Sequence, residues 1–306
     1  MRTQNYDIIG DIHGYADQLH ELLEKLDFNL VEGVYQNPER KAVFLGDFID
    51  RGPQQREVLQ TVMPMVNRGH ALAVMGNHEF NALAFHPADP EQPGCWLRPR
   101  SDKNIQQHSR FLEEYLPKKE ELDEVLRFFQ RLHLWLDLDG IRVVHACWDQ
   151  QILKALGNQP GLSPELLIAA SDRNKPEYQA LDTLLKGAEY ELPPGIYFTD
   201  KDGRKRTEVR TRWWINEACC LEDAVLPPGI LDKETGSMMM EAEDFVGYGP
   251  SEKPVFIGHY WFEGIPERCA KNVACLDYSV AGNGKLVAYR WSGEQTVSDE
   301  NFVYVS

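Results

Sequence analysis

Gly46-Asp47-Phe48-Ile49-Asp50-Arg51-Gly52 follows directly on the apolar run of residues 42–45. That run reads as a short buried strand, and the glycine after it lets the backbone turn sharply without a Cβ clash. The same pattern recurs at Gly10-Asp11-Ile12-His13-Gly14, Gly76-Asn77-His78-Glu79, Val143-Val144-His145-Ala146 and Phe256-Ile257-Gly258-His259. Because ligands of open α/β folds bind beyond the carboxyl ends of the strands, we expect these polar groups to converge on one site.

The side chains that these motifs offer are carboxylates, imidazoles and an amide, with no thiolate. Such a set suits Mn, Fe or Zn and argues against a structural zinc knot built from cysteines. Two divalent ions roughly 3.5 to 4 Å apart can bind both the attacking and the leaving oxygens of an in-line phosphoryl displacement. The motifs therefore predict a two-metal phosphoesterase centre.

Three of the motifs, in this order, resemble those of the calcineurin-like metallophosphoesterases, and within them the phosphoprotein phosphatase branch that includes bacterial diadenosine tetraphosphatases. The resemblance implies an α/β fold, a four-layer α/β/β/α sandwich with two central mixed sheets. We expect one domain over residues 1–306, with residues 149–250 as an insertion that shapes the substrate site. A boundary between residues 11 and 259 would split the predicted site.

The resemblance also implies which residues hold two divalent metal ions, with Mn as the first choice and Fe or Zn as alternatives. The first ion would be held by Asp11, His13 and Asp47. The second would be held by Asp47, Asn77, His145 and His259. Asp47 would then be the carboxylate that bridges the two ions.

Further residues are matched to the substrate. His78, oriented by Asp50, would protonate the leaving oxygen or stabilise its charge, and the planar guanidinium of Arg51 would bind the phosphate. A second phosphate-binding arginine is implied between the last two histidine ligands, with Arg212 as the first choice and Arg210 as the alternate. The remaining candidate substrate contacts are Asn77 and Tyr278, the latter with structural packing as its alternative.

Residues 197–209 predict a hairpin that turns at Asp202-Gly203. Basic residues gather on this hairpin and just beyond it: Lys201, Arg204, Lys205, Arg206, Arg210 and Arg212. For residues 201–206 a solvated hairpin tip and an anion-binding surface both remain open. The aromatic residues 260–262 could stack a nucleobase or pack in the interior.

Two helices interrupted at Pro117 are predicted over residues 103–132, and a hairpin at Asp139-Gly140 is predicted to join strands at 134–138 and 141–144.

Five histidines have no expected chemistry and are placed on surfaces or at helix ends: His20, His70, His86, His108 and His133.

Composition limits the partners. The net charge of −16 argues against duplex nucleic acid, which requires an extended basic surface. The chain enters its first predicted strand by residue 6, has no run of 18 apolar residues and no Cys-x-x-Cys pair. We therefore expect a cytoplasmic protein with reduced thiols and no membrane partner.

These features together predict a hydrolase that acts on a phosphorylated substrate. The first choice is a phosphatase that hydrolyses phosphomonoesters, phosphoprotein or small phosphoester, by direct in-line attack of metal-bound water or hydroxide. The alternatives are a dinucleoside polyphosphate hydrolase of the diadenosine tetraphosphate type and an RNA-end phosphatase or phosphodiesterase. A non-catalytic metal-binding module is disfavoured, because every ligand position is filled.

Overall fold

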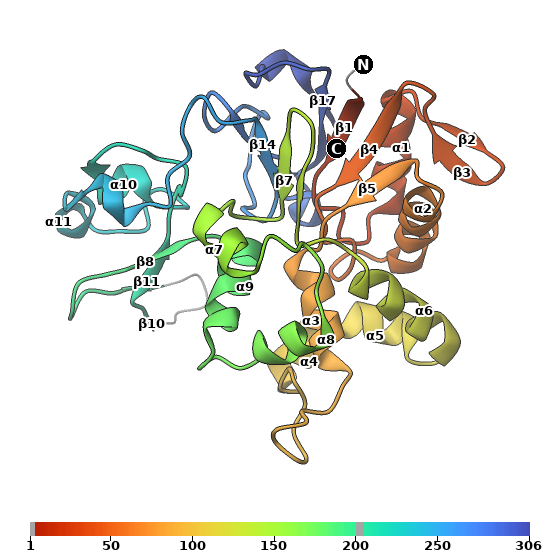
Figure 1. Cartoon of the computed structure of the whole chain (residues 1–306), viewed down its shortest axis with the longest axis horizontal. Coiled ribbons are helices and arrows are strands. Elements are labelled where there is room, and N and C mark those ends of the chain that lie inside the picture. Colours follow the sequence, from red (N-terminus) through yellow and green to blue (C-terminus); the bar gives the residue numbers. More distant parts are fainter. Residues whose placement is uncertain (1–3, 200–204) are drawn as a thin grey trace.

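The computed structural model describes residues 4–199 and 205–306, which form two central sheets with helices around them (Figure 1). The first sheet has the order β16-β17-β1-β4-β5, with β18 beside β17. Its strands are β1 (Asn5–Ile9), β4 (Arg40–Phe44), β5 (Ala71–Ala73), β16 (Asp277–Tyr278), β17 (Lys285–Trp291) and β18 (Phe302–Val305). The second has the order β15-β14-β7-β6, with β6 (Trp135–Asp137), β7 (Arg142–Val144), β14 (Val255–Ile257) and β15 (Val273–Cys275).

Both sheets are mixed. Strands β1, β4 and β5 run parallel, whereas β17 is antiparallel to β1. In the second sheet β14 is parallel to β7 and β15, and β6 forms the predicted antiparallel pair with β7. The carboxyl ends of β1, β4, β5, β7 and β14 therefore carry the five motifs, as the sequence predicts.

Alternate strand residues enter different layers of the core. Ile8 and Val43 of the first sheet share one buried cluster with Val143 and Phe256 of the second. Their sequence neighbours Ile9 and Phe44, by contrast, belong to the cluster that contains the buried helix residues. Because successive strand side chains point to opposite faces, both faces of the first sheet are buried. This arrangement confirms the predicted four-layer α/β/β/α sandwich.

The helices that pack on the first sheet each bury one stripe of apolar side chains. Helix α1 (Ala16–Lys25) buries Leu19, Leu22 and Leu23 against β17 and β18, and α2 (Gln55–Asn67) packs on β5. The short hairpin of β2 (Asn29–Val31) and β3 (Val34–Gln36) lies beside α2. Further helices are α3 (Asn77–Phe85), α6 (Lys119–Gln130), α7 (Gln150–Ala155), α8 (Pro164–Ala169) and α9 (Pro176–Lys186).

The helical region before α6 differs from the prediction. Two helices were expected over residues 103–132, but α4 (Asp102–Gln107) and α5 (Ser109–Tyr115) are separate, so that there are three. The additional break falls at His108, which is completely buried. A histidine that must turn inward at this point is not visible in the periodicity of the sequence.

Part of the predicted insertion has a small core of its own. Leu192, Val209, Leu221 and Met240 pack together apart from the sandwich, and α10 and α11 project to one side in Figure 1. The elements here are β8 (Glu189–Glu191), β9 (Phe198–Thr199), β10 (Lys205–Arg206), β11 (Glu208–Arg210), β12 (Cys219–Cys220), α10 (Leu221–Ala224), α11 (Lys233–Gly236) and β13 (Met239–Met240). Strands β9 and β10 pair as the predicted hairpin requires, while the predicted turn at Asp202-Gly203, with Lys201 and Arg204, lies outside the described residues.

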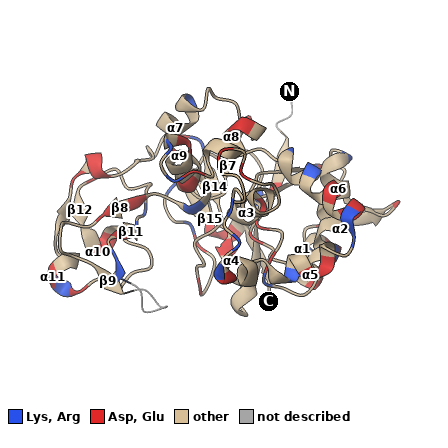
Figure 2. Ribbon diagram, turned by 90° about the horizontal axis from the view of Figure 1, so that it is seen from below, with Lys and Arg blue, Asp and Glu red and all other residues tan. Residues whose placement is uncertain are grey.

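Charges of both signs are interspersed on the outer helices. Helices α2, α5 and α6 each carry basic and acidic residues, as Figure 2 shows. Such mixed faces are typical of solvated helices. Across residues 4–199 and 205–306, no helix has the length and apolar character needed to cross a membrane.

Candidate metal centre

The five motifs meet at one place, with Asp47 in the middle. Asp47 forms one group with His13 and His78 and a second group with His145 and His259, and within each group the ligand atoms lie within 4.8 Å of one another. Asp47 Oδ2 is 3.6 Å from His13 Nε2 and 3.4 Å from His145 Nε2. A carboxylate that belongs to both groups has the position that a bridging ligand needs.

Atoms without a partner mark the same place. Buried polar atoms in proteins are nearly always hydrogen-bonded. Within the described parts of the chain, five of the six predicted metal ligands each present a buried atom that lacks such a partner. These atoms are Asp11 Oδ1, His13 Nε2, Asn77 Oδ1, His145 Nε2 and His259 Nε2. Free carboxylate, amide and imidazole atoms of this kind are ligands that divalent cations accept.

Two of the imidazoles, those of His13 and His145, are held in orientation by hydrogen bonds from Nδ1, the ring nitrogen that faces away from the cluster. His13 Nδ1 lies 3.0 Å from the carbonyl oxygen of Ile49, and His145 Nδ1 lies 2.7 Å from that of Leu45. Because a carbonyl oxygen only accepts, each Nδ1 carries the proton and donates it. In the neutral ring, Nε2 then carries the lone pair and faces the cluster, which is the tautomer a metal ligand needs.

The backbone around the cluster is strained. His13, Asp47 and His259 all have positive φ, at 49°, 50° and 71°. Side chains other than glycine rarely adopt this conformation, and its cost is tolerated mainly at functional sites. The chain also approaches itself closely, because a Cβ on Gly258 would lie 2.0 Å from Asp11 Oδ1. Only glycine at this position leaves room for the carboxylate.

Glu79 holds the turn that carries Asp47, a role that the sequence analysis did not assign. Its buried carboxylate accepts backbone hydrogen bonds from Asp47 at 2.8 Å, Phe48 at 2.9 Å and Gly76 at 3.0 Å. It therefore joins the turns that follow β4 and β5. Its position in the sequence could have indicated this role, because Glu79 is the third residue of α3 and a glutamate there caps the start of a helix.

We expect Glu79→Ala to destabilise the metal-free protein by about 3 kcal/mol or more, because three buried N–H groups lose their acceptor at about 1–3 kcal/mol each. Urea unfolding in the presence of a chelator measures the change without a contribution from bound metal. The exposed Glu113, which faces Arg110 at 3.6 Å, provides the control Glu113→Ala, expected within about 0.5 kcal/mol of the parent. Equal stability of the two variants would contradict a role for Glu79 in holding the turn.

His78 and Asp50 form the expected pair. His78 Nδ1 lies 2.5 Å from Asp50 Oδ2, while His78 Nε2 lies 4.0 Å from Asp47 Oδ2. Burial raises the pKa of Asp50, but hydrogen bonds from His108 and His78 outweigh it and hold this pKa below the usual range. Asp50 is therefore a carboxylate that can accept a hydrogen bond from the Nδ1–H of His78 and orient the ring. His78 Nε2 does not belong to the set of buried, unpartnered atoms that the five predicted ligands present.

Arg51 lies at the open side of the cluster. Its side chain is exposed, and its guanidinium carbon lies 4.8 Å from the centroid of the Trp261 ring. That ring in turn lies 5.9 Å from the ring of His13. The Tyr260 ring also lies 5.9 Å from a predicted ligand, the ring of His259, but Tyr260 is buried with its hydroxyl bonded to the carbonyl of Ala146 at 3.1 Å, whereas Trp261 is half-buried.

The two candidate arginines of the insertion have different surroundings. The guanidinium carbon of Arg210 lies 5.8 Å from the centroid of the Tyr260 ring, which lies 5.9 Å from that of the predicted ligand His259. Burial and then the positive charge of Arg210 lower the pKa of His259. The charge of Arg212 acts instead on the thiols of Cys219 and Cys269, where it opposes the rise in pKa caused by burial. Arg210 Nε is buried and has no hydrogen-bond partner in residues 4–199 and 205–306.

Tyr278 packs in the interior. Its side chain is buried, and its hydroxyl accepts a hydrogen bond from the backbone of Glu267 at 3.0 Å. The adjacent Asp277, which the sequence analysis did not single out, is the residue near the cluster. Its carboxylate accepts from the backbone of Trp261 at 2.8 Å, and its charge raises the pKa of Asp11 after burial does so. These contacts favour packing, the alternative role of Tyr278.

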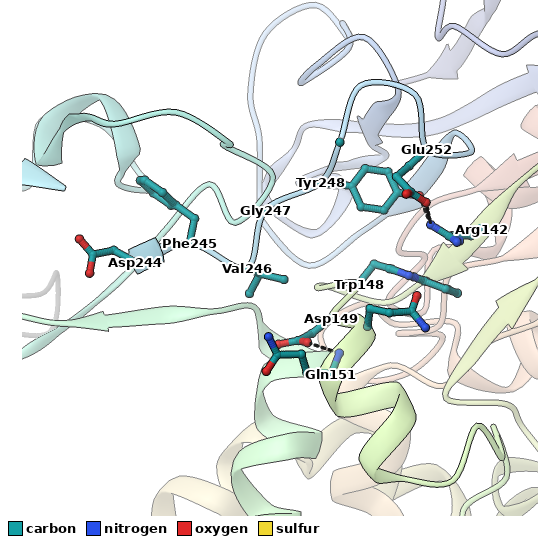
Figure 3. A pocket seen from close by; sticks show the side chains of 12 residues that line it. Arg142, Trp148, Asp149, Gln151, Asp244, Phe245, Val246, Gly247, Tyr248 and Glu252 are labelled. Carbon is teal, nitrogen blue, oxygen red and sulfur yellow. Dashed lines mark hydrogen bonds and ion pairs between the residues drawn. The ribbon is translucent and has the colours of Figure 1, made fainter. Parts of the chain in front are cut away.

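A separate hollow lies beside α7 and does not contain the cluster. It has a volume of about 440 Å³, and its lining includes Arg142, Trp148 and Tyr248 (Figure 3). Arg142 lies against both aromatic rings and forms an ion pair with Glu252 at 2.6 Å. None of the predicted metal ligands lines this hollow, so the predicted chemistry is located elsewhere.

The fold and the cluster define a hydrolase of phosphoester bonds. A sequence model of the calcineurin-like phosphoesterases matches residues 5–175, more than half of the chain, and the protein belongs to that family. Members of this family depend on two divalent metal ions, which agrees with the two groups that share Asp47.

Individual relatives are similar over a shorter stretch. A segment of 74 residues is 46% identical to the bis(5'-nucleosyl)-tetraphosphatase PrpE [asymmetrical] of Halalkalibacterium halodurans and covers 24% of this chain and 30% of that protein. The protein of the same name from Bacillus subtilis is 43% identical over 74 residues, again 24% of this chain and 30% of the relative. The matched segment thus spans less than a third of the length of these relatives.

Solved structures resemble the whole fold at low sequence identity. A protein serine/threonine phosphatase from Saccharomyces cerevisiae superposes with a TM-score of 0.54 and 13% identity, over 98% of this chain and 78% of the other. A cold-active protein-tyrosine phosphatase of a Shewanella species superposes with a TM-score of 0.50 and 15% identity, over 97% of this chain and 81% of the other. This similarity supports the fold and does not identify the substrate.

Proposed function

We propose that the chain is a two-metal phosphatase that hydrolyses phosphomonoesters, either a phosphoprotein or a small phosphoester. The observation that supports it best is that five of the six predicted ligands present a buried atom without a partner, and that the three histidines among them belong to the two groups that share Asp47. In this proposal Asp11, His13 and Asp47 hold one divalent ion. The second is held by Asp47, Asn77, His145 and His259. Oxygen and nitrogen ligands of this kind suit Mn, with Fe or Zn as alternatives.

The bound ions supply a water of lowered pKa and a positive field for the phosphate oxygens. The protein's own groups do the rest. Arg51, exposed at the edge of the cluster, binds two phosphate oxygens through its planar guanidinium. His78 gives a proton to the leaving oxygen from Nε2, while Asp50 holds its Nδ1. Attack is direct, with no phosphoenzyme intermediate.

Arg210 is our preferred second phosphate-binding arginine, with Arg212 now the alternate. Its guanidinium lies beside the Tyr260 ring, which contacts the ring of His259, and its Nε is buried without a partner in the described residues. Because Arg210 ends β11, this assignment also supports the proposal that residues 149–250 shape the substrate site.

We expect Arg210→Ala to lower kcat/KM for p-nitrophenyl phosphate by about 10- to 100-fold, since a hydrogen bond to a charged group contributes about 1.5–3 kcal/mol. Arg212→Ala is the matched control, with an expected change below about threefold. Steady-state kinetics of both variants at saturating Mn²⁺ decide between the two positions. A large loss in Arg212→Ala with parental activity in Arg210→Ala would reverse the assignment.

A second candidate function is hydrolysis of a dinucleoside polyphosphate. The half-buried indole of Trp261 lies beside both Arg51 and His13, where it could stack the base of a nucleotide whose phosphate is bound by Arg51. The names of the curated relatives point the same way. The matched segment covers only 24% of this chain, so this candidate stays second.

One panel of substrates tests these proposals. The purified protein is loaded with Mn²⁺ and assayed against p-nitrophenyl phosphate, a phosphopeptide set, diadenosine tetraphosphate and 3′-phosphorylated RNA. We expect metal-dependent turnover of the phosphomonoesters. Preferential cleavage of diadenosine tetraphosphate would establish the second candidate, and preference for the RNA with a strong salt dependence would establish an RNA-end phosphatase. No turnover of any substrate would contradict a phosphatase.

A further inference from the structure

We propose that His108 is a positioning residue for the leaving-group step: it holds Asp50 in the orientation in which Asp50 directs His78. The proposal rests on the function proposed for His78 above. It concerns a histidine that belongs to none of the five motifs and for which no chemistry was expected from the sequence.

Asp50 lies between two imidazoles, each bonded to a different oxygen. His78 Nδ1 is 2.5 Å from Oδ2, and His108 Nδ1 is 2.9 Å from Oδ1. The carboxylate is 2% exposed, so water does not provide an alternative partner. A carboxylate held at one oxygen can still rotate about its last side-chain bond, whose energy profile is broad. Held at both oxygens, it fixes the plane and direction of the bond to His78.

The backbone of Asp50 is also held from the other side. Its N–H donates to Gln55 Oε1 at 2.6 Å, and Gln55 Nε2 donates to the carbonyl of Gly52 at 2.7 Å. The residue itself has a φ of 67°, in the strained left-handed region. With the backbone fixed by Gln55, the carboxylate orientation is the remaining freedom, and His108 removes it.

His108 is itself rigid. It stands between α4 and α5, is 0% exposed, and its ring stacks on Phe111 with centroids 4.7 Å apart and planes 20° from parallel. Phe85 closes another side, with ring centroids 5.4 Å apart. A group whose own rotamer is locked by packing is suited to orient a reacting residue.

Packing alone does not explain a histidine here. A phenylalanine would fill the stack on Phe111 without the cost of burying a polar ring. His108 Nε2 is buried and has no hydrogen-bond partner among residues 4–199 and 205–306, so Asp50 is the ring's one such partner there. The imidazole is therefore present for the bond that its Nδ1 donates to Asp50.

The test separates the hydrogen bond from the packing. His108→Phe keeps the ring and removes the donor, whereas His108→Asn keeps a donor near the position of Nδ1 and loses ring volume. His20→Phe is the matched control, because His20 contacts Thr61 at 2.8 Å, outside the cluster. Each variant, loaded with Mn²⁺, is assayed with p-nitrophenyl phosphate, which has a good leaving group, and with phenyl phosphate, which has a poor one.

A poor leaving group depends more on the proton from His78. We expect His108→Phe to lower kcat for phenyl phosphate by about 10- to 100-fold, the usual effect of losing a residue that orients a ligand or acid, with a clearly smaller loss for p-nitrophenyl phosphate and little change in KM. His108→Asn should recover most of the loss, and His20→Phe should match the parent.

Equal losses on the two substrates, no loss, or no recovery in His108→Asn would overturn the proposal. If His108→Phe does not fold, His108→Gln replaces it, because its longer amide cannot donate from the Nδ1 position. The variant His78→Asn distinguishes a failure of the role of His78 from a failure of the role of His108. If His78→Asn turns over both substrates like the parent, the proposed role of His78 fails; if it is impaired and His108→Phe is not, only the role of His108 fails.

Discussion

Asp47→Asn is expected to lower turnover of p-nitrophenyl phosphate by at least on the order of 10³-fold and to reduce the metal content from two ions per chain to one or none. The substitution keeps the size of the side chain and removes its negative charge. Asp47 Oδ2 lies between 3.4 and 4.0 Å from the Nε2 atoms of His13, His145 and His78. No other carboxylate belongs to both candidate groups in the described part of the chain, so its loss affects both metal positions at once.

Metal analysis by mass spectrometry after dialysis against Mn²⁺, together with steady-state kinetics, measures both effects. The control is Asp17→Asn, an exposed aspartate in the first turn of α1, which should keep two ions and parental turnover. An Asp47→Asn protein that retained two ions and its activity would show that the carboxylate does not bridge, and the proposed function would lose its central residue.

The candidate metal ligands could be located in the sequence because the pattern that marks them is local. Each follows an apolar run that forms a strand, and the carboxyl ends of these strands meet. Asp11 after β1 and Asp47 after β4 need no long-range information beyond the parallel pairing of the two strands. The fold class was implied by the family resemblance of the same motifs, and the two mixed sheets confirm it.

The residues that hold these ligands could not be found in this way. His145 Nδ1 meets the carbonyl of Leu45 across 100 residues, and His108 meets Asp50 across 58. Contacts of this kind depend on how whole elements pack, and no periodicity or spacing in one sequence records them. His108 is an example, because the sequence around a histidine at a helix end is the same whether the side chain faces solvent or a buried carboxylate.

The insertion shows a different limit. Arg210 and Arg212 are two positions apart, so a strand pattern would place them on the same face. In the structure β11 ends at Arg210, and the chain then turns, with the backbone of Arg212 bonded to Ala224. The two guanidinium groups therefore reach different surroundings. The end of a three-residue strand decides the outcome, and element ends are the least predictable feature of a sequence.

His78→Asn is expected to lower kcat by about 10²- to 10⁴-fold while KM and the content of two metal ions stay near the parental values. The reason is that the two nitrogens of the His78 ring have different surroundings. Nδ1 is bonded to Asp50 at 2.5 Å, and Nε2 faces the cluster 4.0 Å from Asp47 without being one of the buried unpartnered atoms. A residue so placed can move a proton without holding a metal.

Metal analysis and kinetics on the same preparation separate this prediction from that for Asp47. Asp47→Asn should lose ions and activity together, whereas His78→Asn should lose activity alone. The loss should also be larger for phenyl phosphate than for p-nitrophenyl phosphate, because the poorer leaving group needs the proton more. If His78→Asn instead lost an ion, His78 would be a ligand in the group that it forms with His13 and Asp47, and the acid would have to be sought elsewhere.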